Sequence, residues 1–381
     1  MTAPVFFPER VSAVRPTLLM AVYNDLATDG RVQRAARALA GDFDVRVAYP
    51  AASGAAYRAE GYEAAAIPVR GAGPVRLARF SAAVLALARR TRPAVVYAHD
   101  YYLSAVGALA ARLAGAALVY DAHELIVPEP DIPVDRRDRF FYRMEKRSIH
   151  RAGLVIVANR ARGEVMRSHY GLADEPLVVR NIPEAPHPVS AIHRSDAGGV
   201  RLVYQGYMDE GRGIGVFIDA LALLPPEFRL EFIGGGPGLA ALRARAERMG
   251  VGGRMEFAGP IPRDALDARV RACHIGLIAY VAPDRNNRLC APNKLYEYAQ
   301  AGVPVVALGS PYLAGMVREG GVGTALATED VSPERVAAAI RELAGSLPGY
   351  AGRLQTFVAA HPWSAEAEPL RRAVAALVTA S

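Results

Sequence analysis

The chain alternates between short aliphatic or β-branched runs and longer stretches in which apolar residues recur at helical spacing. Short continuous apolar runs are typical of strands buried on both faces, and helical stretches between them predict crossover connections. The alternation therefore predicts α/β architecture with parallel sheets. The predicted strands of the first half are residues 18–23, 45–49, 95–98, 117–120, 154–158 and 177–179, and its helices are 31–40, 77–90, 103–113, 135–150 and 162–170.

The same pattern restarts in the second half after a segment rich in Pro and Gly. Residues 182–200 lack an apolar period, which predicts a linker. We expect two doubly wound domains, residues 1–184 and 185–362, and a helix at 365–377 able to pack on either domain. The second-half strands are predicted at 202–205, 230–233, 255–258, 276–279 and 303–307, and the helices at 214–224, 239–249, 263–272, 293–301, 312–319 and 332–343.

Composition narrows the class of protein. A chain of 381 residues with 52% hydrophobic content suits two α/β domains, and no uncharged apolar run approaches the ~20 residues that cross a bilayer. Residues 1–15 lack the pattern of a secretory signal. With only Cys273 and Cys290, a disulfide framework and a cysteine metal site are both excluded, so we expect a soluble cytoplasmic protein.

The formal charge of +7 comes mainly from arginines spread along helices. In the stretch 135–150, Phe140, Phe141 and Tyr142 interrupt a series of basic residues. An amphipathic basic helix with aromatics can lie on an anionic membrane, and this predicts a peripheral protein on the inner face of the plasma membrane. The alternative is a solvated helix face with its aromatics in the core.

One short helix carries a cation at its positive end. Residues 293–301 are predicted to be helical, because Pro292 suits the first turn and Gly302 marks a stop. Lys294 in the first turn opposes the helix dipole at a cost of about a few tenths of a kcal/mol, unless an anion binds there. Glu297 on the same face could hold sugar hydroxyls, so the pair predicts a nucleotide-sugar site. A solvated lysine in a surface pair with Glu297 is the alternative.

Two further strand-to-helix junctions offer places for an anion, since ligands collect at the carboxyl ends of parallel strands. The junction 206–213 places Arg212 beside another positive helix end, and its glycines let backbone amides approach an anion. The junction 234–238 is glycine-rich, but Pro237 breaks the spacing of a dinucleotide fingerprint. Arg212 and Lys294 together predict a clamp for a diphosphate that needs no metal. The glycines concerned are Gly206, Gly211, Gly213, Gly235 and Gly236.

Taken together, these segments resemble the GT-B glycosyltransferases of the retaining glycosyltransferase family 4. The resemblance runs over nearly the whole chain, through residues 22–25 with 31–32, 120–125, 181–183, 206–213, 234–237 and 293–304. It implies two Rossmann-like domains facing a cleft, the first for the acceptor and the second for the nucleotide diphosphate sugar. It also implies that the helix after Pro362-Trp363-Ser364, in residues 363–381, crosses back to the first domain.

The resemblance assigns donor contacts to named positions. Glu297 matches the second glutamate of the family's two-glutamate pattern, which contacts the ribose, whereas Leu289 stands where the first glutamate is expected. Tyr207 replaces a diphosphate-binding arginine, and Arg212 fills the position of the second cation. The full set of implied donor contacts is Gly206, Gly211, Gly213, Gly235, Gly236, Pro237, Asn293, Lys294 and Glu297.

In the first half, His123 resembles the family's histidine that reaches the donor sugar. His123, Arg212 and Lys294 are therefore the predicted catalytic residues. The acceptor contacts implied are Asn24, Asp25, Asp29, Arg31, His99, Asp100 and Glu124. A packed structural role is the alternative for His99. No spacing of His, Asp and Glu predicts a metal site.

The expected activity is transfer of one sugar from a UDP-sugar or GDP-sugar to a glycan or lipid-linked acceptor hydroxyl, with retention of configuration. We expect no cofactor and no nucleic-acid partner. Polysaccharide or glycolipid assembly is the default role by analogy. Two alternatives remain: a nucleotide-sugar epimerase of the same fold, and a non-catalytic scaffold that binds a membrane or a partner. A nicotinamide dehydrogenase is disfavoured, because no glycine fingerprint follows the first strand.

Overall fold

The computed structural model describes residues 15–51, 57–184, 199–281 and 283–379. They group into two compact units, one made of residues 15–121, 143–155 and 370–379, the other of residues 122–142 and 156–369. Residues 185–198 of the predicted linker lie outside the described residues, as does the start of the predicted second domain.

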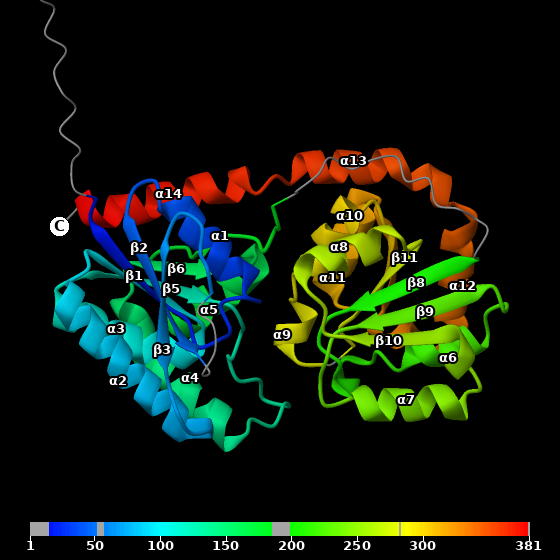
Figure 1. Cartoon of the computed structure of the whole chain (residues 1–381), viewed down its shortest axis with the longest axis horizontal. Coiled ribbons are helices and arrows are strands. Elements are labelled where there is room, and N and C mark those ends of the chain that lie inside the picture. Colours follow the sequence, from blue (N-terminus) through cyan, green and yellow to red (C-terminus); the bar gives the residue numbers. More distant parts are fainter. Residues whose placement is uncertain (1–14, 52–56, 185–198, 282, 380–381) are drawn as a thin grey trace, which may run out of the picture. The chain divides into compact units, whose positions relative to one another are not determined.

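The first sheet has seven strands in the order β3-β2-β1-β4-β5-β6-β7, a doubly wound arrangement (Figure 1). The central strand β1 pairs in parallel with both β2 and β4, and Leu18 lies beside Val45 and Val95. The strands are β1 (Thr17–Ala21), β2 (Asp44–Ala51), β3 (Glu63–Pro68), β4 (Val95–His99), β5 (Ala117–Ala122), β6 (Leu154–Val157) and β7 (Leu177–Val178). The helices are α1 (Gly30–Leu39), α2 (Gly73–Thr91), α3 (Ser104–Ala114), α4 (Arg136–Ser148) and α5 (Arg160–Tyr170).

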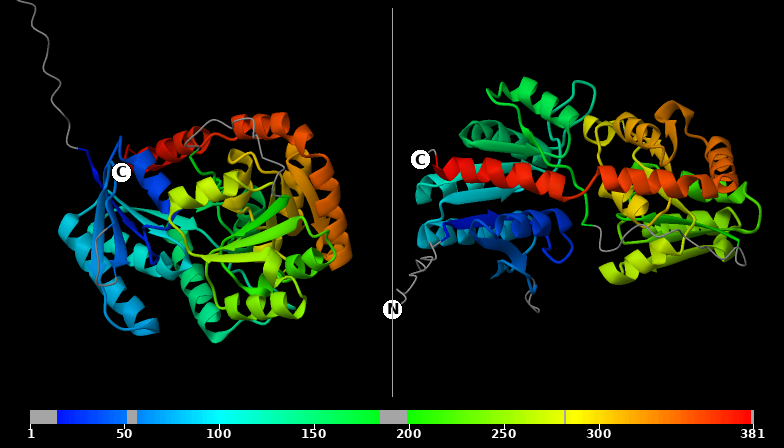
Figure 2. Two further views of the ribbon diagram at one scale, coloured as in Figure 1. Left: turned by 45° about the vertical axis from the view of Figure 1, so that its right-hand side comes forward. Right: turned by 90° about the horizontal axis from the view of Figure 1, so that it is seen from above.

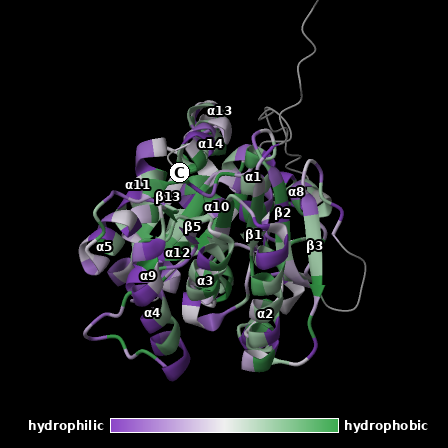
Figure 3. Ribbon diagram, turned by 90° about the vertical axis from the view of Figure 1, so that its left-hand side faces the viewer, coloured by the Kyte–Doolittle hydropathy of each residue, from purple (hydrophilic) through white to green (hydrophobic). Residues whose placement is uncertain are grey.

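The central strands of this sheet are apolar on both sides because helices cover both faces. Leu18, Leu19 and Met20 of β1 are fully buried, and every residue of β4 is buried. Helices α2 and α3 pack together on one face, where Gly107 lets α3 approach β4 until a Cβ would lie 2.5 Å from that of Ala98. In Figure 3, β1 is coloured mainly hydrophobic, whereas α5 carries mainly hydrophilic residues.

The second sheet has six strands in the order β10-β9-β8-β11-β12-β13, and its pairs are parallel. The strands are β8 (Val200–Gln205), β9 (Phe228–Ile233), β10 (Met255–Gly259), β11 (Ile275–Ala279), β12 (Val305–Gly309) and β13 (Gly323–Ala327). The helices are α6 (Val216–Ala222), α7 (Leu239–Arg248), α8 (Arg263–Arg271), α9 (Arg285–Arg288), α10 (Asn293–Gln300), α11 (Pro311–Gly320), α12 (Pro333–Gly345) and α13 (Ala351–Ala360).

Alternate residues of β8 enter two separate hydrophobic clusters. Leu202 and Tyr204 join a cluster formed with α6, α7 and α12, whereas Val203 joins one formed with α10, α11 and α13. This is the period of two that a strand imposes on its side chains, and it fixes which helices lie on which face. The prediction of two doubly wound parallel sheets is confirmed.

Helix α14 (Ser364–Thr379) follows α13 directly in the chain (Figure 2). Its second half belongs to the first unit, where Arg371 forms an ion pair with Asp42 at 2.9 Å and Leu377 lies against Gly153. The return of the C-terminal helix to the first unit is therefore confirmed. No helix in the described stretches is both long and apolar enough to cross a bilayer.

The sequence pattern missed four elements. β3 is Ala-rich and sits at the edge of its sheet, so it shows neither β-branched enrichment nor a buried run. β13 is likewise an edge strand of half-buried residues. Helix α9 has four residues, too few to show a period, and α13 presents only Leu354 and Phe357 to the core.

Candidate functional site

The site in the second unit is organised by α10, whose position depends on one buried tyrosine. Tyr298 donates its hydroxyl proton to the carbonyl of Val203 at 3.1 Å and accepts from the amide of Gln205, which ties α10 to the end of β8. Its ring crosses Gly276 of β11, where a Cβ would lie 2.7 Å from the ring. Any larger residue at 276 would displace α10, so this contact sets the place of the helix and of Lys294 on its first turn.

Lys294 is buried, with 6% of its surface exposed. Its amine lies 4.8 Å from the ring centre of Tyr204 and 5.5 Å from that of Tyr280, within range of cation–π attraction. Among the described residues this amine has no hydrogen-bond partner. Burial, and secondarily the Arg212 guanidinium, lowers the pKa of Lys294 to about 8. A buried ammonium without an acceptor is a site prepared for an anion.

Arg212 supplies the second positive charge. It ends the short 3₁₀ turn Glu210–Arg212 after β8, and its guanidinium carbon lies 5.4 Å from the ring centre of Tyr280. Since Tyr280 also borders Lys294, both cations share one aromatic wall. We call Arg212 and Lys294 the cation pair. Their binding of a diphosphate stays a prediction, and the Arg212 charge adds to burial in lowering the pKa of Lys294.

Gly206 makes room for Lys294. A Cβ at this position would lie 2.6 Å from Cε and 2.7 Å from Nζ of Lys294, and the backbone has φ +129°, which only glycine adopts readily. Gly234 is tighter still, because its Cβ would lie 2.0 Å from the carbonyl oxygen of Gly206. The glycines thus bring the β8 and β9 loops together beneath the amine.

The amides of these loops are largely engaged within the protein. The amide of Gly206 donates to Ile233, that of Gly211 to the Asp209 carboxylate and that of Gly213 to Glu210. Gly235 accepts from the amide of Met208, and Gly236 and Pro237 follow in the turn before α7. Contact between an anion and these glycines stays a prediction. The structure shows that their backbone groups hold the loops together.

Glu297 is held by two side-chain amides. One oxygen of its carboxylate accepts from Gln205 at 2.6 Å and the other accepts from Asn293 at 3.1 Å. Gln205 ends β8 and Asn293 begins α10, so the carboxylate links the end of β8 to the first turn of the helix that carries Lys294. Its predicted ribose contact stays a prediction. Gln205 was not among the predicted site residues. Its position as a polar residue at the end of an apolar strand could have indicated it.

In the first unit, Arg31 and His99 meet at the buried Asp121. The Arg31 guanidinium forms an ion pair with Asp121 at 2.7 Å, and Nδ1 of His99 lies 3.5 Å from the same carboxylate. Tyr97 donates to Asp121 at 3.1 Å and stacks on His99 with ring centres 4.4 Å apart. The sequence did not predict that Asp121 and Tyr97 hold Arg31 and His99, because nothing local in the sequence links these residues.

The other first-unit candidates shape turns at the ends of β1 and β4. Asp29 caps α1 by accepting from the amide of Val32 and also accepts from Asn24. Asp25 accepts from the amide of Ala27, and Asp100, at φ +66°, accepts from that of Tyr101. These local bonds order the loops, and the predicted acceptor contacts of the four residues stay predictions.

His99, Asp121 and His123 offer three potential metal ligands within 4.8 Å of one another, the one such group in the described residues. The donor set does not favour a divalent ion, because Arg31 already neutralises the carboxylate. The group is better described as a polar cluster of two buried residues, His99 and Asp121, and the partly buried His123.

His123 and Glu124 lie in the loop after β5 and are tied to Arg162 of α5. Nη1 of Arg162 donates to the carbonyl of His123 at 2.6 Å, and Nη2 lies 3.4 Å from the half-exposed Glu124 carboxylate. Arg162 itself is 4% exposed. Nothing local in the sequence marks Arg162 as a functional residue, since an arginine at the start of a helix is usually a surface residue.

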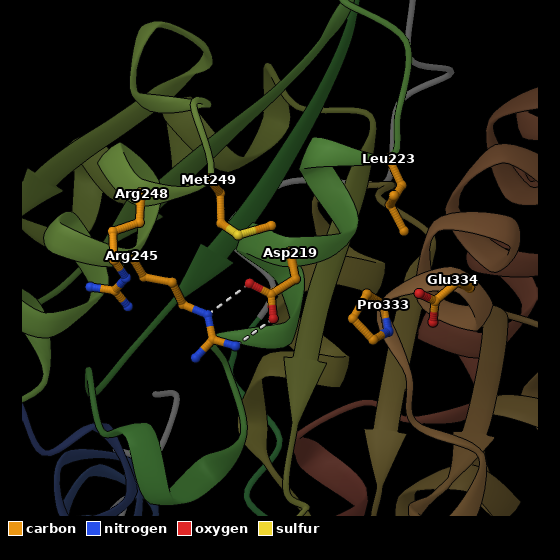
Figure 4. Close-up of a pocket in the computed structure, with 7 residues that line it drawn as sticks. All are labelled: Asp219, Leu223, Arg245, Arg248, Met249, Pro333 and Glu334. Carbon is orange, nitrogen blue, oxygen red and sulfur yellow. Dashed lines mark hydrogen bonds and ion pairs between the residues drawn. The ribbon is translucent and has the colours of Figure 1, made fainter.

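A separate surface cavity of about 460 Å³ lies among α6, α7 and α12 (Figure 4). The ion pair of Asp219 with Arg245 crosses it, and Leu223 and Met249 border it. None of its lining residues belongs to the cation pair, and its one central carboxylate is neutralised. The cation pair therefore remains the candidate functional site.

The low pKa of Lys294 predicts a pH dependence of anion binding. Lys294 is protonated in the folded protein below about pH 8 and becomes neutral above it, so affinity for a diphosphate should be highest below pH 8. Above pH 8 the affinity for a diphosphate should fall progressively more steeply. The steepest slope that the loss of one proton can cause is about tenfold per pH unit. Calorimetric titration with UDP and GDP measures this, and the Lys294→Met variant should lack the step.

Two family models match the chain, one in each half. The model described as Glycosyltransferase Family 4 matches residues 31–181, and the model described as Glycosyl transferases group 1 matches residues 199–346. The D-inositol 3-phosphate glycosyltransferase of Acidothermus cellulolyticus is 28% identical over 325 residues, which cover 76% of this chain and 68% of that protein.

Solved structures show the same fold at low identity. Sucrose-phosphate synthase from Thermosynechococcus elongatus has a TM-score of 0.80 at 18% identity, covering 96% of this chain and all of its own. The Anabaena protein HepE, solved with UDP and glucose, has a TM-score of 0.72 at 17% identity with the same coverage. With a parallel sheet in each half, a returning C-terminal helix and family matches over both halves, the chain belongs to the GT-B glycosyltransferases of family 4.

Proposed function

We propose that this glycosyltransferase transfers a sugar from a nucleotide diphosphate sugar to an acceptor hydroxyl, with retention of configuration and without a divalent metal. The observation that carries the proposal is the buried amine of Lys294, which lies beside Arg212 and has no hydrogen-bond partner among the described residues. A leaving diphosphate gains negative charge as the glycosidic bond breaks, and preorganised cations in a dry site stabilise that charge.

The relatives support this donor class. Structures of HepE contain UDP and UDP-glucose, and the Acidothermus relative is named for transfer to an inositol phosphate. We propose UDP-sugars and GDP-sugars as the donors of this chain, and a glycan or lipid-linked hydroxyl as acceptor. Retention follows from the family resemblance. In that mechanism the leaving phosphate oxygen accepts the proton of the incoming hydroxyl on the same face of the sugar.

The test is a panel of UDP-sugars and GDP-sugars, incubated with glycan and glycolipid acceptors in the presence of EDTA. The expected result is release of UDP or GDP that depends on acceptor, and a product whose anomeric proton shows the donor's configuration by NMR. Donor alone is included, because a new epimer without acceptor would instead indicate an epimerase. If the protein neither binds a nucleotide nor turns over any donor of the panel, the proposed function is wrong. The remaining alternative is then a non-catalytic scaffold.

We also propose that the exposed face of α4 contacts an anionic membrane. Phe140 is 55% exposed on this helix, and Arg136, Arg143 and Arg147 are exposed at spacings of four, three and seven residues from it. These spacings place the three arginines around one aromatic ring on the same side of the helix. Figure 3 shows hydrophilic colour along much of α4. An insertable aromatic within a basic patch suits a surface of anionic lipid headgroups.

The double substitution Arg143→Ala/Arg147→Ala should lower partitioning onto phosphatidylglycerol vesicles by more than tenfold, since each basic residue near such a surface contributes about 1 kcal/mol. Phe140→Ser should also weaken it. Vesicle flotation measures both, with neutral phosphatidylcholine vesicles for comparison. The control is Arg229→Ala/Arg248→Ala, two exposed arginines of the second unit. Equal losses in both double variants would show that only net charge matters.

A further inference from the structure

Arg162 is a buried arginine whose contacts are mainly to neutral groups. Its side chain is 5% exposed, and its nearest carboxylate, Glu124, is half exposed and 3.4 Å away. Burying a guanidinium costs free energy that its hydrogen bonds must offset. The acceptors of those hydrogen bonds therefore indicate what the residue holds in place.

The hydrogen bonds of Arg162 join two segments of the second unit. Nη1 donates to the carbonyl of His123 at 2.6 Å, while Nη2 donates to the side-chain oxygen of Asn286 at 2.6 Å and to its carbonyl at 3.0 Å. The same side-chain oxygen of Asn286 accepts from the amide of Leu125 at 2.9 Å. We call these contacts the Arg162–Asn286 bridge. The bridge fixes the backbone on both sides of Glu124 against α9.

The start of α5 fixes the other end of α9. Asn159 is fully buried and accepts from the amide of Arg162, and its Nδ2 donates to the carbonyl of Leu289 at 2.8 Å. From Leu289 the chain passes through Cys290 to Lys294 on the first turn of α10. One helix start therefore holds both the His123 loop and the segment that leads to the cation pair.

We propose that Arg162 is a positioning residue for glycosyl transfer, which through Asn286 holds His123 at a set place relative to the segment 286–294. The inference rests on the proposed function, in which Lys294 binds the diphosphate, and on the role that the family resemblance implies for His123, which is to reach the donor sugar. Loss of the bridge leaves the cation pair in place but lets the His123 loop move. A displacement of about 1 Å of a reacting group can lower the rate on the order of 100-fold.

Arg162→Lys keeps the positive charge but cannot donate in a fork to both His123 and Asn286. We expect kcat to fall at least about tenfold, with the donor KM and the calorimetric Kd for UDP or GDP within about twofold of the wild type. Asn286→Ala should reproduce this loss, and Asn286→Asp, which retains the acceptor oxygen, should keep most of the activity. The control is Arg160→Lys on the same helix, whose side chain is 76% exposed.

Hydrogen exchange gives a readout that needs no turnover. The amide of Leu125 should exchange faster in Arg162→Lys and Asn286→Ala than in the wild type, because Asn286 is its acceptor. If the wild type transfers sugar but both variants keep kcat within twofold, the positioning role is wrong. An equal loss of UDP affinity and kcat would also contradict it. A wild-type protein that transfers no sugar would overturn the proposed function instead. If the Leu125 amide exchanges at the same rate in the variants as in the wild type, the Arg162–Asn286 bridge does not hold this loop.

Discussion

Replacing Lys294 by methionine is expected to lower the turnover of glycosyl transfer by about 100-fold or more and to weaken binding of UDP or GDP. Methionine keeps an unbranched apolar side chain but removes the charge that lies over the rings of Tyr204 and Tyr280. Removing one preorganised donor to a developing anion typically costs about 3 kcal/mol. Since the Lys294 ammonium is buried without a hydrogen-bond acceptor among the described residues, the folded protein itself should tolerate the change.

Steady-state kinetics and calorimetry measure the effect, and Lys146→Met on the exposed side of α4 is the matched lysine control. The unfolding free energy of Lys294→Met should equal or exceed that of the wild type at pH 7. Wild-type stability should itself rise between about pH 8 and 10.5, because there the unfolded chain holds a proton on Lys294 that the folded chain has lost. Turnover within a few-fold of the wild type would remove Lys294 from the catalytic set.

Replacing Arg31 by methionine is expected to destabilise the first unit by about 3–5 kcal/mol, since it leaves the Asp121 carboxylate buried without its counter-ion. The side chains of Arg31 and Asp121 are 8% and 2% exposed, so water cannot replace the lost partner. Tyr97 and His99 contact the same carboxylate, and their packing should loosen with it. Urea unfolding at pH 7 measures the loss.

The double variant Arg31→Met/Asp121→Leu is the control for this prediction. Removing both charges leaves no unpaired ion, so it should recover much of the stability that the single variant loses. A single variant that loses less than about 1 kcal/mol would contradict a buried, unscreened ion pair. Unchanged UDP or GDP affinity in the single variant would show that Arg31 acts through the fold of the first unit and not through the donor.

The sequence determined the architecture through local patterns that need no knowledge of the fold. Apolar runs such as those of β1 and β8 are readable because burial on both faces leaves no polar position. Lys294 was found because a cation in the first turn of a helix is unfavourable on local grounds alone. Arg212 was found by the same reasoning, and the structure places both against Tyr280.

Only the tertiary structure decided what these residues face. The lowered pKa of Lys294 depends on its burial and on Arg212, which is 82 positions earlier in the chain. The pair of Arg31 with Asp121 and the bridge of Arg162 with Asn286 join residues 90 and 124 positions apart. Such pairs leave no periodic or local trace, because each partner alone resembles an ordinary polar residue. Their burial and mutual hydrogen bonds, which arise only when distant segments pack together, give them their roles.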